Sequence, residues 1–335
     1  MATPVAVLGS GSFGTALAAL AASRDHDVTL WARSPDVAEV IEREHRNPRY
    51  LTDIPLPPAV RATSDLAEAL AGRELVILAV PSHGLRDVVG AARHLLADGA
   101  VLVSTVKGIE VDTGLLVHQI LEEILEPEQA ERVTYLSGPS FAREVALRKP
   151  TAVTVASRDE TWAIGVQSSL ASPWFRIYSH SDVVGVEVGG ALKNVIALAV
   201  GICDGLEAGA NGRAAVMTRG LAEITRLGVR LGANPVTFLG LSGVGDLVLT
   251  CTGDLSRNRQ VGLALGRGRK LEEILAEMSQ VAEGVRTTRA TRSLARRLGV
   301  EMPITELVHR VLDGDVAPGD AVHLLMTRQL RSEVE

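Results

Sequence analysis

The sequence has few cysteines and no excess of positive charge. Its only cysteines, Cys203 and Cys251, lie far apart and form no C-x-x-C pair. This is typical of reduced thiols in a cytoplasmic protein and argues against a disulfide framework or a zinc site. The 34 Lys and Arg residues are outnumbered by 40 Asp and Glu residues, for a formal net charge of −6. We therefore expect no general affinity for nucleic acid, and an anionic substrate would need a locally basic site.

Signals of several other protein classes are missing. Residues 1–23 carry no charged side chain, so they lack the basic n-region of a signal peptide. Elsewhere the apolar runs read as too short to span a bilayer, and we expect no membrane insertion. The histidines show no metal-ligand spacing such as H-E-x-x-H, and no Ser/His/Asp arrangement or glycosidase-like carboxylate pair stands out. We therefore expect no bound metal.

A glycine-rich turn stands near the start of the chain. Val5–Leu8 is a short apolar run typical of a buried strand, and Thr15–Ala22 is rich in the helix formers Ala and Leu. Gly9, Gly11 and Gly14 lie between these segments with the spacing G-x-G-x-x-G. Such glycines permit a tight turn, close approach of a pyrophosphate and close packing of helix on strand. Because a helix N-terminus also attracts phosphate, the pattern predicts a dinucleotide site.

The end of the second predicted strand bears on the choice of dinucleotide. Val28–Ala32 is followed by Arg33, where NAD-preferring sites usually carry an acidic residue. An arginine suits a 2′-phosphate through its charge and its paired donors. Arg33 could instead be a solvated charge, and Asp36 could still reach a ribose. The pattern favours NADPH, with NADH possible.

Alternating patterns predict the fold class of the first half and a change of class in the second. Further buried strands are expected at Leu75–Val80, before Lys107, before Ser137 and within 151–157 and 175–180, whereas 47–60 is rich in proline and reads as a surface loop. Helices are expected between the earlier strands, at Asp65–Ala71 and Leu115–Leu125. This alternation predicts an α/β Rossmann-type domain with a mainly parallel, doubly wound sheet.

From about Val186 onward only helical periodicity is visible. The expected helices are Gly190–Cys203, Ala214–Leu231, Arg257–Leu265, Leu271–Met278, Thr287–Leu298 and Thr305–Leu312. We therefore predict a dinucleotide-binding domain over residues 1–185 and an all-helical substrate and catalytic domain over residues 186–335.

Polar residues and turns gather at the predicted strand ends. Gly9, Arg33, Pro81, Lys107 and the turn 137–140 all follow strands, and ligands of open α/β sheets bind beyond the carboxyl ends of the strands. Each has an ordinary interpretation by itself, such as a strand stop or a surface charge. Together they indicate a site at this edge of the sheet.

Two polar spots interrupt the apolar helical half. Lys193 and Asn194 lie within an otherwise apolar helix, where a lysine is costly unless it is paired or reaches solvent. Asp246 follows a glycine-rich turn, and Ser256-Arg257-Asn258 begins a predicted helix. A serine N-cap beside Arg and Asn can hold a phosphate, although a plain helix cap has the same pattern.

A series of motifs follows along the chain: GSGSFGTALA, LWAR, AVPSH, STVKGIE, SGPSFAREV, EVGGALKNVIALAVGICDGL, GLSGVGDLVLTCTGDLSRNRQVG, VAEGVRT and MPITE. In this order they resemble the bacterial NAD(P)-dependent glycerol-3-phosphate dehydrogenase family, over roughly residues 4–313. The resemblance implies an enzyme that reduces dihydroxyacetone phosphate to sn-glycerol 3-phosphate with NADPH or NADH. It further implies that the enzyme is a homodimer and that its product supplies phospholipid synthesis.

The resemblance also implies roles for individual residues. Lys193 matches the catalytic lysine of the family, and Asp246 and Asn194 match its polar partners. Positions around the substrate are matched by Lys107, Gly138, Ser140, Ser256, Arg257 and Asn258, and positions around the cofactor by Ser12, Phe13, Arg33, Lys107, Ala142, Arg257, Val281 and Glu283. Phe13 departs from the Trp of many relatives, and we expect little consequence because both side chains are large and apolar.

Two alternatives stay open from the residues. A reductase for another keto acid or sugar acid would keep the fold and change the substrate. A nucleotide-sensing or scaffold protein without catalysis would have no need of the costly groups Lys193 and Asp246.

Overall fold

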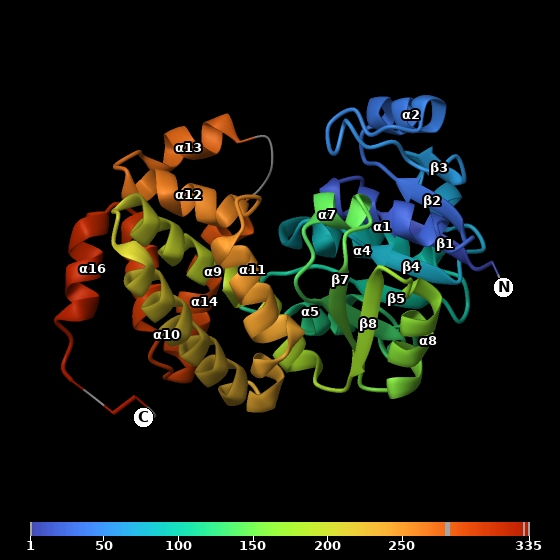
Figure 1. Ribbon diagram of the computed structural model, residues 1–335. Coiled ribbons are helices and arrows are strands. Elements are labelled where there is room, and N and C mark those ends of the chain that lie inside the picture. The colour runs from blue at the N-terminus through green and yellow to red at the C-terminus, as the bar shows by residue number, and fades with distance from the viewer. Residues whose placement is uncertain (1, 279–281, 331, 334–335) are drawn as a thin grey trace.

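The computed structural model describes residues 2–278, 282–330 and 332–333. Figure 1 shows two halves, one built around a β-sheet and one made of helices, with the N-terminus on the first and the C-terminus on the second. The helix α9 leads from one half to the other.

The first half contains one eight-stranded sheet with the order β3-β2-β1-β4-β5-β6-β7-β8. Its neighbouring strands are parallel except for the antiparallel pair β6–β7. The strands are β1 Pro4–Leu8, β2 Asp27–Trp31, β3 Val60–Thr63, β4 Leu75–Leu78, β5 Val101–Ser104, β6 Val133–Ser137, β7 Thr151–Ala156 and β8 Phe175–His180. The Rossmann-type prediction is confirmed. The sequence analysis missed β3, a four-residue edge strand whose partly exposed pattern resembles a loop.

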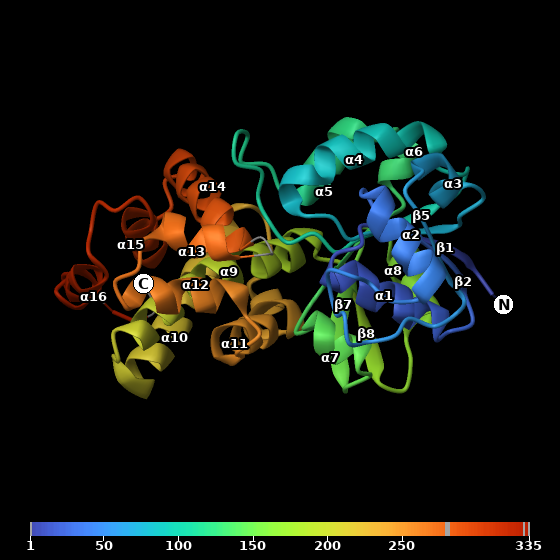
Figure 2. The same ribbon diagram turned by 90° about the horizontal axis from the view of Figure 1, so that it is seen from above.

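Helices cover both faces of this sheet. The cores place α1, α2 and α8 on one face and α3, α4 and α5 on the other, and Figure 2 shows α4 and α5 on the side away from α1. The bounds are α1 Ser12–Ala22, α2 Pro35–Glu44, α3 Leu66–Leu70, α4 Leu85–Ala92, α5 Val117–Ile124, α6 Pro127–Ala130, α7 Ala142–Ala146 and α8 Glu160–Leu170, with 3₁₀ turns η1 Ser82–Gly84 and η2 Arg93–Leu95.

The second half is helical throughout its described residues, as predicted. It comprises α9 Val183–Gly205, α10 Gly209–Arg230, the 3₁₀ turn η3 Pro235–Leu239, the π turn η4 Leu241–Gly245, α11 Asp246–Thr252, α12 Arg257–Gly266, α13 Leu271–Glu277, α14 Glu283–Leu298, α15 Pro303–Leu312 and α16 Pro318–Met326. The short helices α11 and α16 were not predicted. The sequence analysis placed the start of α9 at Gly190, seven residues after its start in the structure.

The central helix α9 corrects one expectation. It has 23 residues and contains an 18-residue window with a mean hydropathy of 1.7, which is long and apolar enough to cross a bilayer, so not every apolar run is too short. However, 94% of the apolar window is buried inside the protein. Its apolar side chains form the core of the helical half instead.

The boundary predicted after residue 185 lies in the first turn of α9. Val186 packs in a core of the sheet-containing half, and Val188 packs in the helical core. As a division into domains, the boundary stays a prediction.

Close contact of two helix backbones brings α12 against α9. Side chains at Gly201 and Gly205 would overlap the backbone of α12, and side chains at Gly262 and Gly266 would overlap that of α9. These glycines let the two backbones touch. Since α12 begins at Arg257, this packing carries the Ser256-Arg257-Asn258 segment toward Lys193 and Asn194 on α9.

Candidate active site

The glycine turn has the conformation that its spacing predicts. Gly9 has a φ of +118°, and a Cβ there would lie 2.6 Å from the carbonyl oxygen of Ala79. A Cβ on Gly14 would overlap the carbonyl oxygen of Gly9, whereas a Cβ on Gly11 would meet no atom within 4 Å. The first and third glycines are therefore required by the packing, and Gly11 leaves open space at the N-terminus of α1. This geometry fits a bound pyrophosphate.

A buried asparagine that the sequence analysis missed supports this turn. Asn47 is 1% exposed, and its Nδ2 donates to the carbonyl oxygen of Ser10 and to Oγ1 of Thr15, each at 2.8 Å. Its Oδ1 accepts from the backbone nitrogens of Arg49 and Tyr50. Asn47 opens the proline-rich passage read as a surface loop, and one asparagine there carries no signal of burial.

Two lysines from different halves of the molecule share one carboxylate. Lys107 follows β5, and its Nζ donates to Oδ2 of Asp246 at 2.6 Å and to the carbonyl oxygen of Gly138 at 3.2 Å. Nζ of Lys193, on α9, donates to the other oxygen, Oδ1. Asp246 is 1% exposed and begins α11. The structure therefore brings together four residues predicted from separate motifs.

Glycines allow these elements to approach so closely. A Cβ on Gly189 would overlap the carbonyl oxygen of Ser242, so the turn before Asp246 packs directly on α9. A Cβ on Gly190 would lie 2.6 Å from Oγ of Ser137 and 3.5 Å from Cγ of Lys107.

The surroundings of Lys193 adjust its charge. Its pKa is lowered from 10.5 to about 7: burial has the largest effect and lowers it, the Asp246 carboxylate acts to raise it, and the Lys107 ammonium acts to lower it. Burial alone would raise the pKa of Asp246, but the two ammonium groups outweigh burial and lower it. Lys193 can therefore exchange a proton near neutral pH while Asp246 stays ionised.

Two asparagines connect α9, α12 and α14. Nδ2 of Asn258 donates to Oδ1 of Asn194 at 2.9 Å, and Oδ1 of Asn258 accepts from the backbone nitrogen of Gly284 at 2.9 Å. Ser256 is the N-cap of α12 and accepts from the backbone nitrogen of Arg259 at 3.3 Å. Burial lowers the pKa of Arg257, against the effect of Glu283. A cluster of polar side chains thus lies at the start of α12, and it is joined to Asn194, the residue after Lys193.

The remaining predicted residues lie around the carboxyl edge of the sheet. Ser12 and Phe13 form the first turn of α1, and Ala142 begins α7. Arg33 is exposed after β2, with Nη2 3.3 Å from where a Cβ on Gly84 would stand.

Two further polar groups complete this edge. Oγ of Ser140 donates to the carbonyl oxygen of Gly138 at 3.0 Å. Glu283 reaches from α14 to Ser82. Val281 lies outside the described residues.

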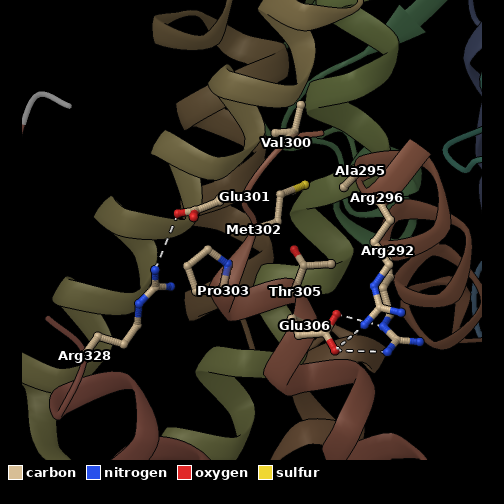
Figure 3. A pocket seen from close by; sticks show the side chains of 10 residues that line it. All are labelled: Arg292, Ala295, Arg296, Val300, Glu301, Met302, Pro303, Thr305, Glu306 and Arg328. Atoms are coloured by element: carbon tan, nitrogen blue, oxygen red, sulfur yellow. Dashed lines mark hydrogen bonds and ion pairs between the residues drawn. The ribbon is translucent and has the colours of Figure 1, made fainter. Parts of the chain in front are cut away.

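A separate pocket lies in the helical half (Figure 3). It has a volume of about 270 Å³ and is lined by Arg292, Ala295, Arg296, Val300, Glu301, Met302, Pro303, Thr305, Glu306 and Arg328. None of the predicted site residues lines it. Arg292 and Arg296 pair with Glu306, and Arg328 pairs with Glu301, so each charged side chain of the lining lies in an ion pair.

Family models match both halves of the chain. The N-terminal model of the NAD-dependent glycerol-3-phosphate dehydrogenases matches residues 4–163, and the C-terminal model matches residues 182–323. The chain belongs to this family. The family resemblance seen in the motifs is therefore confirmed.

Individual relatives agree with the family models. A "Glycerol-3-phosphate dehydrogenase [NAD(P)+]" of Syntrophotalea carbinolica is 54% identical over 99% of both chains. One of the same name from Citrifermentans bemidjiense is also 54% identical over 99% of both chains. The crystal structure of a glycerol-3-phosphate dehydrogenase from Coxiella burnetii has a TM-score of 0.92 and 38% identity, and the match covers 98% of this chain and 99% of that one.

Proposed function

We propose that this protein reduces dihydroxyacetone phosphate to sn-glycerol 3-phosphate, reversibly, with NADPH preferred and NADH possible. The observation that carries the proposal is Lys193, a buried lysine with its pKa lowered to about 7, held by Asp246 beside the strand ends. A general acid works best when its pKa lies near the operating pH.

In the reaction the bound reduced nicotinamide would supply the hydride. Lys193 would stabilise the negative charge that grows on the carbonyl oxygen and donate the proton to it; in the reverse direction its neutral amine would accept that proton. Asp246 orients the ammonium of Lys193. Lys107 pairs with the same carboxylate and places a second positive charge in the site. Asn194 completes the catalytic group.

The substrate phosphate would be held at the start of α12. Ser256-Arg257-Asn258 offers a helix N-terminus and a guanidinium there, and Asn258 orients the amide of Asn194 by accepting from Gly284 and donating to Asn194. Lys107, Gly138 and Ser140 would form the other side of the substrate site. Holding the phosphate fixes the carbonyl position, and such positioning is worth up to about 7–11 kcal/mol.

The cofactor would lie along the carboxyl edge of the sheet. Gly9, Gly11 and Gly14, with Ser12 and Phe13 in the same turn, would hold the pyrophosphate, and Arg33 would bind the 2′-phosphate. Ala142, Lys107, Arg257 and Glu283 would contact the rest of the cofactor, and Val281 is proposed from the family motif alone.

We further propose a cytoplasmic homodimer that works without a metal and supplies phospholipid synthesis. The described residues contain no group of three or more His, Cys, Asp or Glu side chains that could hold a metal ion, and the proposed proton transfer needs none.

The test is oxidation of NADPH and of NADH, followed by near-UV absorbance. Dihydroxyacetone phosphate is compared with unphosphorylated dihydroxyacetone, which has the same ketone without the phosphate. Fast oxidation with the phosphorylated ketone alone is expected. Similar rates with both ketones would contradict the proposal that a site binds the substrate phosphate. Binding of NADPH without its oxidation would contradict the proposal that dihydroxyacetone phosphate is the substrate.

A further inference from the structure

Ser82 joins the two halves of the molecule at the carboxyl edge of the sheet. It begins η1, four residues after the end of β4. Its backbone nitrogen donates to Oε1 of Glu283 at 3.0 Å, and its Oγ donates to Oε2 at 2.7 Å. Glu283 is the first residue of α14 in the helical half. Two donors from one half therefore hold both oxygens of one carboxylate from the other.

The backbone at Gly108 packs closely on this contact. A Cβ on Gly108 would lie 2.7 Å from Cβ of Ser82, 2.9 Å from its Oγ and 3.8 Å from Oε2 of Glu283. The backbone beside Lys107 is thus packed directly on the Ser82–Glu283 pair. Ser82 consequently lies where the end of β4, the segment carrying Lys107 and the start of α14 meet.

The start of α14 is fixed from its other side as well. The backbone nitrogen of Gly284 donates to Asn258, which in turn donates to Asn194. A Cβ on Gly284 would lie 2.7 Å from the carbonyl oxygen of Asn194 and from Oδ1 of Asn258. Adjacent residues of α14 therefore contact Ser82 in the sheet-containing half and the asparagines of the proposed substrate site.

We propose that Ser82 is a positioning residue, which holds the Glu283 carboxylate in place at the cofactor site and thereby couples cofactor binding to substrate binding. This inference rests on the proposed function, in which Glu283 contacts the cofactor. Without the Ser82 hydroxyl, the carboxylate would keep one of the two hydrogen bonds described for it, from the Ser82 backbone N–H, and could then rotate. The start of α14 would lose one of these two hydrogen bonds to the sheet-containing half.

The test measures the Kd of NADPH from its fluorescence, with and without sn-glycerol 3-phosphate. Ser82→Ala is expected to weaken NADPH about tenfold, the effect of one hydrogen bond to a charged group. It is also expected to reduce, several-fold, the factor by which sn-glycerol 3-phosphate tightens NADPH. The matched control is Ser168→Ala, an exposed serine on α8, which should change neither value.

A double-mutant cycle separates positioning from a general structural effect. If Ser82 acts through Glu283, Ser82→Ala has no further effect on NADPH binding in a Glu283→Ala background. The inference is overturned if Ser82→Ala weakens NADPH binding equally in the wild-type and Glu283→Ala backgrounds, or in neither. The proposed function still stands in that case, provided that the wild type binds NADPH. Failure of the wild type to bind NADPH overturns both.

A second variant guards against poor folding of Ser82→Ala. Glu283→Gln keeps the shape of the side chain and removes one of the two acceptors for Ser82. The expected loss is again about tenfold, for the same hydrogen bond. Unchanged NADPH binding in a folded Glu283→Gln protein overturns the inference.

Discussion

Replacing Asp246 by Asn is expected to shift the pH dependence of ketone reduction toward acid. The pKa of Lys193 is about 7 because burial lowers it further than the Asp246 carboxylate raises it. An opposite charge at this range shifts a pKa by about 1–3 units. Without the carboxylate, the pKa of Lys193 should therefore fall about 1–3 units below 7, and fewer molecules carry the proton at neutral pH.

Replacing Lys107 by Met is expected to shift the same pH dependence the other way. The Lys107 ammonium acts to lower the pKa of Lys193 and competes with it for Asp246. Its removal should raise the pKa of Lys193 by about 1 unit, the low end of the effect of a nearby charge. Both variants lose activity, but the midpoints of their pH profiles should move in opposite directions.

The assay is kcat/KM for dihydroxyacetone phosphate, measured in the direction of reduction from about pH 5 to pH 9, because this ratio reports groups of the free enzyme. The acid form of Lys193 is the active form in this direction. Activity in the wild type should therefore fall as pH rises through about 7. Titration of the substrate phosphate is common to all three proteins and cancels in the differences between them. Midpoints that stay together, or that move in the same direction, would refute the assignment of Lys193 as the acid.

Three further predictions test single residues. Lys193→Ala should lower turnover by ~10² or more, the scale of general acid catalysis, while NADPH still binds; near-normal turnover would exclude Lys193 as the acid. Arg33→Ala should weaken NADPH about tenfold and NADH little, measured as two Kd values, since only NADPH carries the 2′-phosphate; equal losses would argue against that contact, and Asp36→Ala serves as the control for ribose binding. Gly14→Ala should destabilise the fold by about 3 kcal/mol because its Cβ would overlap Gly9. Gly11→Ala should leave the thermal unfolding temperature nearly unchanged and weaken NADPH binding. Equal stability of the two variants would contradict the packing argument.

The residues that the sequence analysis missed lack a local pattern. Asn47 is buried because its amide pairs with the glycine turn, and Ser82 matters because it faces Glu283, 201 residues later in the chain. Neither partner is visible from neighbouring residues. The length of α9 was underestimated because Val183–Gly189 reads as a transition between halves, although it already packs in both cores.

Local sequence patterns predict the strand–turn–helix around Gly9, Gly11 and Gly14, the alternation of strands and helices and the helical second half. These features depend on residue periodicity and backbone freedom, which act over a few neighbouring positions. The motifs also identify the family.

The meeting of the charged residues, by contrast, depends on how distant segments pack together. Lys107, Lys193 and Asp246 come from three distant segments, and their shared contact depends on the packing of α9 against the turn before α11 and against the residues after β5. The pKa of Lys193 follows from that contact and from burial, and burial exists only once both halves have packed around the lysine.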